Sequence, residues 1–183
     1  MSKEFNGLSQ RSSKAKVDIV LRKERTRQVT LVKTEQTLAF LKPESIMRGL
    51  IGEIISRFER KGLLLVAAKL LQMSDKQARE LYAMHSSKPF FQELVSHVTS
   101  APVFVMAWEG PNAVSVARNL VGATNPAVAA PGTIRGDFAL NITPNAIHAS
   151  DSLENAKREL SIFFSEAEKT SYSKPTEQQY LLK

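Results

Sequence analysis

Cysteine is absent from this chain of 183 residues, which excludes disulfide bonds and thiol catalysis. No run of about 18 apolar residues occurs either, so we expect no membrane span. The sequence also lacks clustered carboxylates with metal-ligand spacing and the Gly-x4-Gly-Lys-Ser/Thr phosphate loop. These absences predict a protein without a metal site of its own, and we expect a cytoplasmic location.

Basic residues are concentrated at the N-terminus. The first 34 residues hold nine Lys or Arg against three acidic residues, a net charge of +6 out of +7 for the whole chain. We expect residues 1–34 to be a basic, flexible extension and residues 35–183 to form one domain. Attraction to nucleic acid or to an anionic surface, and a targeting role, are the alternatives for the extension.

The domain alternates strand and helix patterns. Apolar runs predict strands, and apolar residues at helical spacing predict helices, one opened by a Ser74-x-x-Gln77 capping box and another closed by Gly122. The strands are expected over 37–41, 63–71, 103–108 and 138–142, and the helices over 50–60, 74–85, 89–98, 112–121 and 152–164. This order lets helices cover one sheet but leaves the strand order open.

His148 lies near the end of the most informative stretch, residues 118–152. Pro126 and Pro131 interrupt helix formation, so we expect most of the first half of this stretch to be a long loop. His148 precedes the good N-cap residues 150–152, and the free N–H groups of a helix N-terminus favour an anion. Neutral imidazole is a nucleophile at pH 7, and Arg118 and Arg135 offer forked donors to phosphates. The stretch therefore suits phosphoryl transfer.

Several segments in a fixed order resemble nucleoside diphosphate kinases. They are TLAFLKPES at 37–45, RGLIGEIISRFERKG at 48–62, KPFFQELV at 88–95, ATNPAVAAPGTIRGDF at 123–138 and NAIHASDS at 145–152. The resemblance implies an α+β fold of ferredoxin-like, split βαβ topology, with a four-stranded antiparallel sheet covered by helices. It also implies ping-pong transfer of the γ-phosphoryl group of a nucleoside triphosphate such as ATP to a nucleoside diphosphate.

The resemblance assigns roles residue by residue. His148 matches the nucleophile that becomes a phosphohistidine. Glu159 matches the glutamate that helps to orient that imidazole, with Ser150 close by, and Tyr82 matches a tyrosine beside the histidine. The nucleotide-binding positions are Lys42, Phe90, Leu94, Arg118, Thr124, Arg135 and Asn145, where Phe90 and Leu94 form an apolar clamp on the base. A stacked base implies broad base specificity. Mg²⁺ is expected to arrive on the nucleotide phosphates, and a homo-oligomer, preferably a hexamer, is expected.

The sequence departs from the family's usual motifs at three positions, Glu44, Ala123 and Ala149, and the last adds a Cβ beside the nucleophile. His85 and His97 lack a comparable context and are expected to be structural. The competing hypotheses are a nucleotide- or nucleic-acid-binding regulator that uses the basic extension, and a phosphohistidine protein that passes its phosphoryl group to other proteins. Phe90 and Leu94, four residues apart, also suit the core-facing side of an ordinary helix without any role in base binding.

Overall fold

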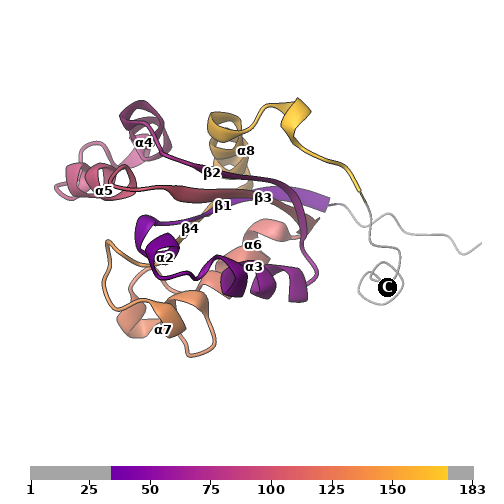
Figure 1. The fold of residues 1–183 in the computed structure, drawn as a ribbon, viewed down its shortest axis with the longest axis horizontal. Helices are drawn as coiled ribbons and strands as arrows, with labels where there is room; N and C mark the ends of the chain where they lie inside the picture. Colours follow the sequence, from indigo (N-terminus) through magenta and orange to yellow (C-terminus); the bar gives the residue numbers. More distant parts are fainter. Residues whose placement is uncertain (1–33, 173–183) are drawn as a thin grey trace, which may run out of the picture. The chain divides into compact units, whose positions relative to one another are not determined.

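Four strands pair into one sheet in the order β2-β3-β1-β4, and every neighbouring pair is antiparallel. The computed structural model describes residues 34–172, so nearly all of the expected basic extension lies outside the described residues. The strands are β1 (Thr34–Leu41), β2 (Leu64–Leu71), β3 (Val103–Pro111) and β4 (Ile147–Ala149). The predicted ferredoxin-like α+β fold is confirmed (Figure 1).

Helices cover both faces of this sheet. On one face lie α4 (Asp75–Leu81), α5 (Phe91–Val98) and α8 (Leu153–Phe163), and on the other lie α3 (Ile51–Arg60), α6 (Ala113–Val121) and α7 (Ile134–Phe138). The short α2 (Pro43–Met47) follows β1, and three 3-10 turns occupy Ala83–His85, Pro126–Val128 and Glu166–Glu168. No described helix is long and apolar enough to cross a membrane.

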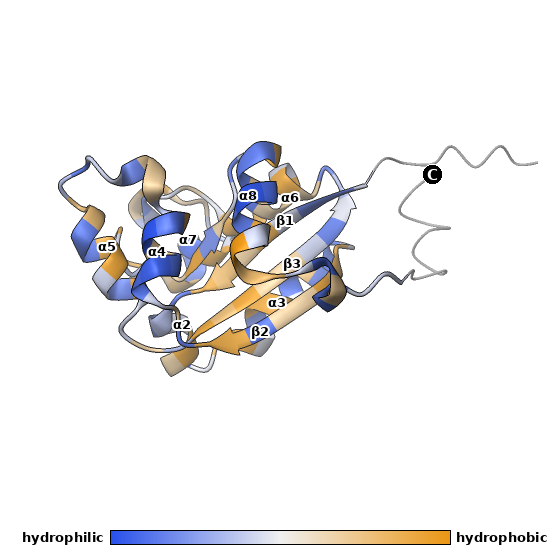
Figure 2. Cartoon of the chain, turned by 90° about the horizontal axis from the view of Figure 1, so that it is seen from above, coloured by the Kyte–Doolittle hydropathy of each residue, from blue (hydrophilic) through white to orange (hydrophobic). Residues whose placement is uncertain are grey.

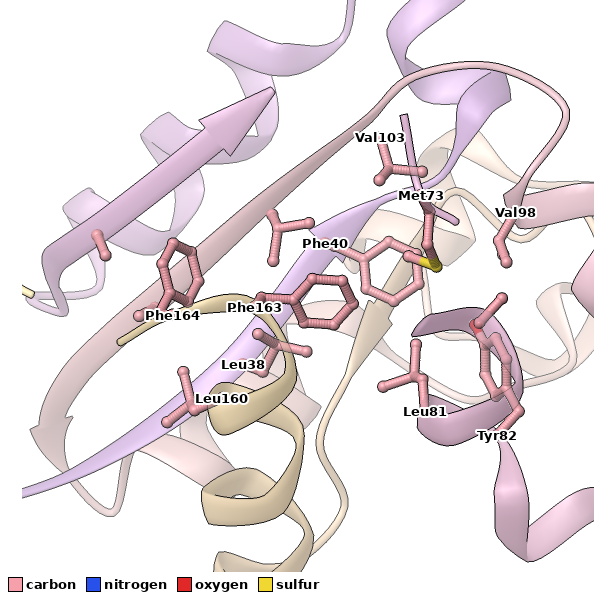
Figure 3. Close-up of a cluster of buried hydrophobic side chains, with 14 of the residues drawn as sticks. Leu38, Phe40, Met73, Leu81, Tyr82, Val98, Val103, Leu160, Phe163 and Phe164 are labelled. Carbon is pink, nitrogen blue, oxygen red and sulfur yellow. The ribbon is translucent and has the colours of Figure 1, made fainter. Parts of the chain in front are cut away.

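The central strand β1 contributes to two separate cores. Leu38 and Phe40 point to the side of α4, α5 and α8, whereas Ala39 and Leu41 point to the side of α3, α6 and α7, as the two-residue period of a strand requires. Figure 3 shows the first of these cores, in which Phe40 lies close to Phe163. In Figure 2 the sheet is mainly hydrophobic, while α4 and α8 carry hydrophilic stretches.

Local sequence signals account for several boundaries. Ser74 and Gln77 form the predicted capping box at the start of α4, and the Ser152 hydroxyl accepts a hydrogen bond from the N–H of Asn155 at the start of α8. Pro43 takes the first position of α2, where its missing N–H costs nothing. Gly122 ends α6 as predicted.

The expected strand over 138–142 is wrong. Residues up to Phe138 belong to the short helix α7, which Thr133 caps through the N–H of Gly136, and residues 139–146 follow without a strand. Leu140 is 93% exposed, so this apolar residue does not mark a core strand. The fourth strand is instead Ile147–Ala149, so His148 lies on a strand.

The backbone at Gly122 gives a stability prediction. Its φ of +86° and ψ of −179° fall in a region that is essentially restricted to glycine, and an added Cβ would collide with the Thr133 side chain. We expect Gly122→Ala to lower the free energy of unfolding by about 3 kcal/mol, measured by chemical denaturation.

Gly49 provides the matched control for that variant. It also has a positive φ, +68°, but nothing lies within 4 Å of a Cβ placed there. Gly49→Ala should therefore lose only about 1 kcal/mol, the cost of the left-handed conformation alone. Equal losses in the two variants would contradict the steric role of Thr133.

Candidate active site

His148 is held on three sides. In the β1–β4 pairing it lies opposite Phe40, and the two rings stack with centroids 5.0 Å apart. The Tyr82 ring meets the imidazole edge-on at 5.8 Å. The His148 side chain is 19% exposed, so it is partly open to solvent while its ring plane is fixed by aromatic contacts.

A buried carboxylate fixes one nitrogen of this imidazole. The Nε2 atom of His148 lies 2.8 Å from Oε2 of Glu159, and the Ser150 hydroxyl donates to the same oxygen at 2.7 Å. Glu159 and Ser150 are both buried. Because a carboxylate accepts hydrogen bonds, this contact places the proton on Nε2 and leaves Nδ1 with a free lone pair. The structure thus brings together the predicted residues His148, Glu159, Ser150 and Tyr82.

A second group surrounds the turn that precedes β4. The buried guanidinium of Arg135 donates to the carbonyl oxygens of Gly122, Asn145 and Ile147, at distances of 2.8 to 3.3 Å. Burial, and then the nearby charge of Arg118, lower the pKa of Arg135 to about 10, so it remains a cation at pH 7. Arg135 is therefore a rigid positive charge beside the residue that precedes His148.

Asn145 and Lys42 belong to this second group. The Asn145 amide donates to the carbonyl oxygen of Thr124 at 3.0 Å, and the Lys42 ammonium donates to the carbonyl oxygen of Thr143 at 2.7 Å. Burial, only partly offset by the charge of Glu44, lowers the pKa of Lys42 to about 8. The predicted residues Lys42, Thr124, Arg135 and Asn145 thus lie around one turn.

Two buried polar atoms of the site have no hydrogen-bond partner among residues 34–172, the hydroxyl of Tyr82 and Oδ1 of Asn145. Burial raises the pKa of Tyr82, so its hydroxyl keeps its proton and can donate. Such unpaired groups are costly in a folded protein unless a ligand or water satisfies them. Two further atoms of this kind lie on facing residues of β1 and β3, Thr37 and Trp108, outside the site.

The remaining predicted residues are more exposed. Arg118 is half-buried on α6, and its charge acts on Arg135 and Asp151, but its side chain forms no ion pair with any described residue. Phe90 is 48% exposed at the start of α5, and Leu94 lies half-buried on that helix. No ring contact joins Phe90 to His148; the Phe90 ring lies against His85 instead.

Comparisons with known proteins agree on one family. A family model described as nucleoside diphosphate kinase matches residues 35–169. The chain belongs to the nucleoside diphosphate kinase family. It is 54% identical over 140 residues to the nucleoside diphosphate kinase of Halalkalibacterium halodurans, covering 76% of this chain and 95% of that protein. The Archaeoglobus fulgidus nucleoside diphosphate kinase is 53% identical over 143 residues, 78% of this chain and 95% of that protein.

Solved structures of nucleoside diphosphate kinases share the fold. The Halobacterium salinarum enzyme in complex with CDP matches with a TM-score of 0.78 and 42% identity, covering 80% of this chain and 98% of that one. A family protein from Babesia bovis matches with a TM-score of 0.74 and 44% identity, covering 76% and 95%. The predicted membership of the nucleoside diphosphate kinase family is confirmed, and with it the assignment as a phosphotransferase.

Sequence analysis missed two contacts of this site. It did not identify Phe40 as the stacking partner of the His148 ring. The position of Phe40 on a predicted strand, two residues before Lys42, was a signal that could have placed it near the site. Sequence analysis also treated Glu44 only as a departure and His97 as structural, yet their side chains form a hydrogen bond of 2.8 Å. The concern about Ala149 is not supported, because the non-glycine residue with positive φ beside the nucleophile is Ala146.

The buried Lys42 gives a pH prediction. Its pKa is about 8 in the folded chain and 10.5 for an ordinary lysine, so between these values the unfolded chain holds more protons. Stability then rises with pH across this window. We expect the free energy of unfolding of the wild type, minus that of Lys42→Met, to rise from pH 8 to pH 10.5 by on the order of 3 kcal/mol. A difference that stays constant with pH would contradict the burial of this charge.

Proposed function

We propose that the chain transfers the γ-phosphoryl group of a nucleoside triphosphate to a nucleoside diphosphate through a phosphohistidine on His148. The observation that carries this proposal is the fixed imidazole, whose Nε2 is tied to the buried Glu159. Histidine suits a reversible shuttle, because a phosphoryl group on an imidazole nitrogen keeps a high transfer potential. A surface histidine without such partners would have neither a fixed ring orientation nor a fixed tautomer.

The first half-reaction uses the free nitrogen. The Nδ1 lone pair of His148 attacks the γ-phosphorus, the bond from that phosphorus to the bridging oxygen breaks, and the nucleoside diphosphate leaves with that oxygen. The proton stays on Nε2, hydrogen-bonded to Glu159, and the Glu159 carboxylate stabilises the positive charge that develops on the ring. In the second half-reaction a terminal oxygen of another diphosphate attacks the phosphorus of the phosphohistidine. The bond from Nδ1 to that phosphorus breaks, the product leaves as a nucleoside triphosphate, and the neutral imidazole is restored.

The basic residues around the turn before β4 supply the positive charge that this transfer needs. Arg118, Arg135 and Lys42 are proposed to hold the phosphates, with Thr124 at the same turn, while Asn145 offers its unpaired oxygen to a hydroxyl of the sugar. The Tyr82 hydroxyl, buried beside His148 without a partner among the described residues, is proposed as a further donor. Mg²⁺ is proposed to enter on the nucleotide, because these basic and amide groups bind phosphate rather than a metal ion.

Base recognition is proposed to rest on the surface around α5. The half-exposed ring of Phe90 with Leu94 can clamp a base by its face, which every base offers, so base specificity should be broad. The relative with bound CDP shows that a pyrimidine nucleotide is accepted by a protein of this fold. A cytoplasmic location stays a prediction.

A homo-oligomer, with a hexamer preferred, is proposed for the assembled enzyme. The segment from 126 to 142 carries the exposed apolar side chains of Val128, Leu140 and Ile142, which are 72%, 93% and 61% exposed. Exposed apolar side chains of this size occur on surfaces that another chain covers. This observation supports association but does not set the number of subunits.

The central prediction of this proposal is a change in intact mass. Wild-type protein mixed with Mg·ATP should gain one acid-labile phosphoryl group, and added GDP should remove it as GTP. His148→Ala should lose the gain but still bind nucleotide, because the phosphate and base contacts remain.

His85→Ala is the matched control. It removes another half-buried histidine, at the 3-10 turn Ala83–His85, and should keep the full phosphoryl gain. Phosphoryl gain in His148→Ala, or nucleotide binding by the wild type without any gain, would overturn the proposed mechanism.

A further inference from the structure

One carboxylate joins two segments of the proposed nucleotide site that are far apart in sequence. Glu44 lies on α2, directly after Lys42 and Pro43. Its Oε2 atom accepts from Nε2 of His97 on α5 at 2.8 Å, and its Oε1 atom accepts from the backbone N–H of Ala146 at 2.8 Å. The bonded residues are 53 and 102 positions away along the chain.

The turn that Glu44 holds is strained. Ala146 has a φ of +70°, a left-handed conformation that is costly for a residue with a Cβ, and its side chain is fully buried. Its carbonyl oxygen accepts from the backbone N–H of Lys42 at 3.0 Å and from the Ser45 hydroxyl at 2.8 Å. Both polar groups of this peptide position are thus held from α2 and the residue before it, which is how a strained residue persists.

This turn carries proposed nucleotide contacts. Asn145 immediately precedes Ala146, and its carbonyl oxygen accepts from Arg135 at 3.3 Å. The other end of the Glu44 bridge, His97, lies three residues after Leu94, on the helix that begins beside Phe90. The carboxylate therefore connects the sugar and phosphate contacts with the base clamp.

Glu44 has the charge state that this bridge requires. Burial opposes its negative charge, but the hydrogen bonds from His97 and from backbone N–H groups outweigh that effect and keep its pKa below the ordinary value. As a carboxylate it accepts on both oxygens at once, and its side chain is only 19% exposed. The side chain of Glu44 reaches these two partners with one methylene more than that of Asp.

We propose that Glu44 is a positioning residue that couples α5 to the Asn145–Ala146 turn, so that the base clamp and the sugar and phosphate contacts close on the nucleotide together. This inference rests on the proposed function, since it concerns how the same site holds its substrate. His148 is held independently of this bridge, by Glu159, by stacking on Phe40 and by the β1–β4 pairing. Loss of the bridge therefore impairs the nucleotide's placement and leaves the nucleophile intact.

The test compares two phosphoryl donors on the same histidine. Mg·ATP uses the whole nucleotide site, whereas phosphoramidate, a small donor without base or sugar, uses only the nucleophile and its immediate surroundings. Single-turnover phosphorylation of His148 is followed by intact mass in wild type and in Glu44→Ala. We expect kcat/KM with Mg·ATP to fall about ten- to a hundredfold, because a small misplacement of binding groups is costly. The rate with phosphoramidate should stay within about twofold of wild type.

Further variants separate the bridge from a general loss of fold. His97→Leu removes only the α5 end and should raise KM for Mg·ATP more than it lowers kcat, whereas His97→Gln keeps a donor and should restore most of the loss. The matched control is Glu109→Ala, which removes a partly buried glutamate that accepts from Gln36 near the start of β1. It should leave both donor reactions unchanged.

The outcomes are distinct. Normal ATP-driven rates in both Glu44→Ala and His97→Leu, with an active wild type, would overturn the positioning role alone. An equal fall with both donors would also overturn it, because the nucleophile itself would then depend on Glu44. A wild type that accepts a phosphoryl group from phosphoramidate but not from Mg·ATP would overturn the proposed function and, with it, this inference.

Discussion

The antiparallel pairing of β1 with both β3 and β4 is the constraint on which the rest of the structure depends. It places β1 at the centre of the sheet, where alternate residues enter the two cores. The pairing with β4 covers only three residues, and the middle one sets His148 opposite Phe40. Because β1 ends at Leu41, directly before Lys42, the same strand also brings the α2 segment against the turn before β4.

Much of the fold followed from local signals. The capping box at Ser74, the glycine end of α6 and the apolar period of α3 predicted elements that the structure contains. The fourth strand was predicted in the wrong place, because an apolar run at 138–142 resembles a strand, whereas Ile147–Ala149 is too short to show a period. Only pairing with β1 makes those three residues a strand, and pairing is not visible in a single segment.

Some of the site could likewise be predicted from the sequence and some could not. Resemblance to the family pointed to His148, Glu159 and Arg135, and the structure brings their side chains to one region. The link from Glu44 to His97 and Ala146 was out of reach, because it depends on contacts across 53 and 102 residues and on a strained backbone. No pattern of residue types specifies such a contact.

We propose that Glu159, by its contact with Nε2 of the His148 imidazole, directs the phosphoryl group to Nδ1. The most direct test is NMR of the phosphorylated protein with ¹⁵N-labelled histidine, in which the ¹⁵N–³¹P coupling identifies the nitrogen that is bonded to phosphorus. Coupling to Nδ1, with a proton retained on Nε2, is the predicted result. Coupling to Nε2 would contradict the account, because that nitrogen could accept the group only after leaving Glu159.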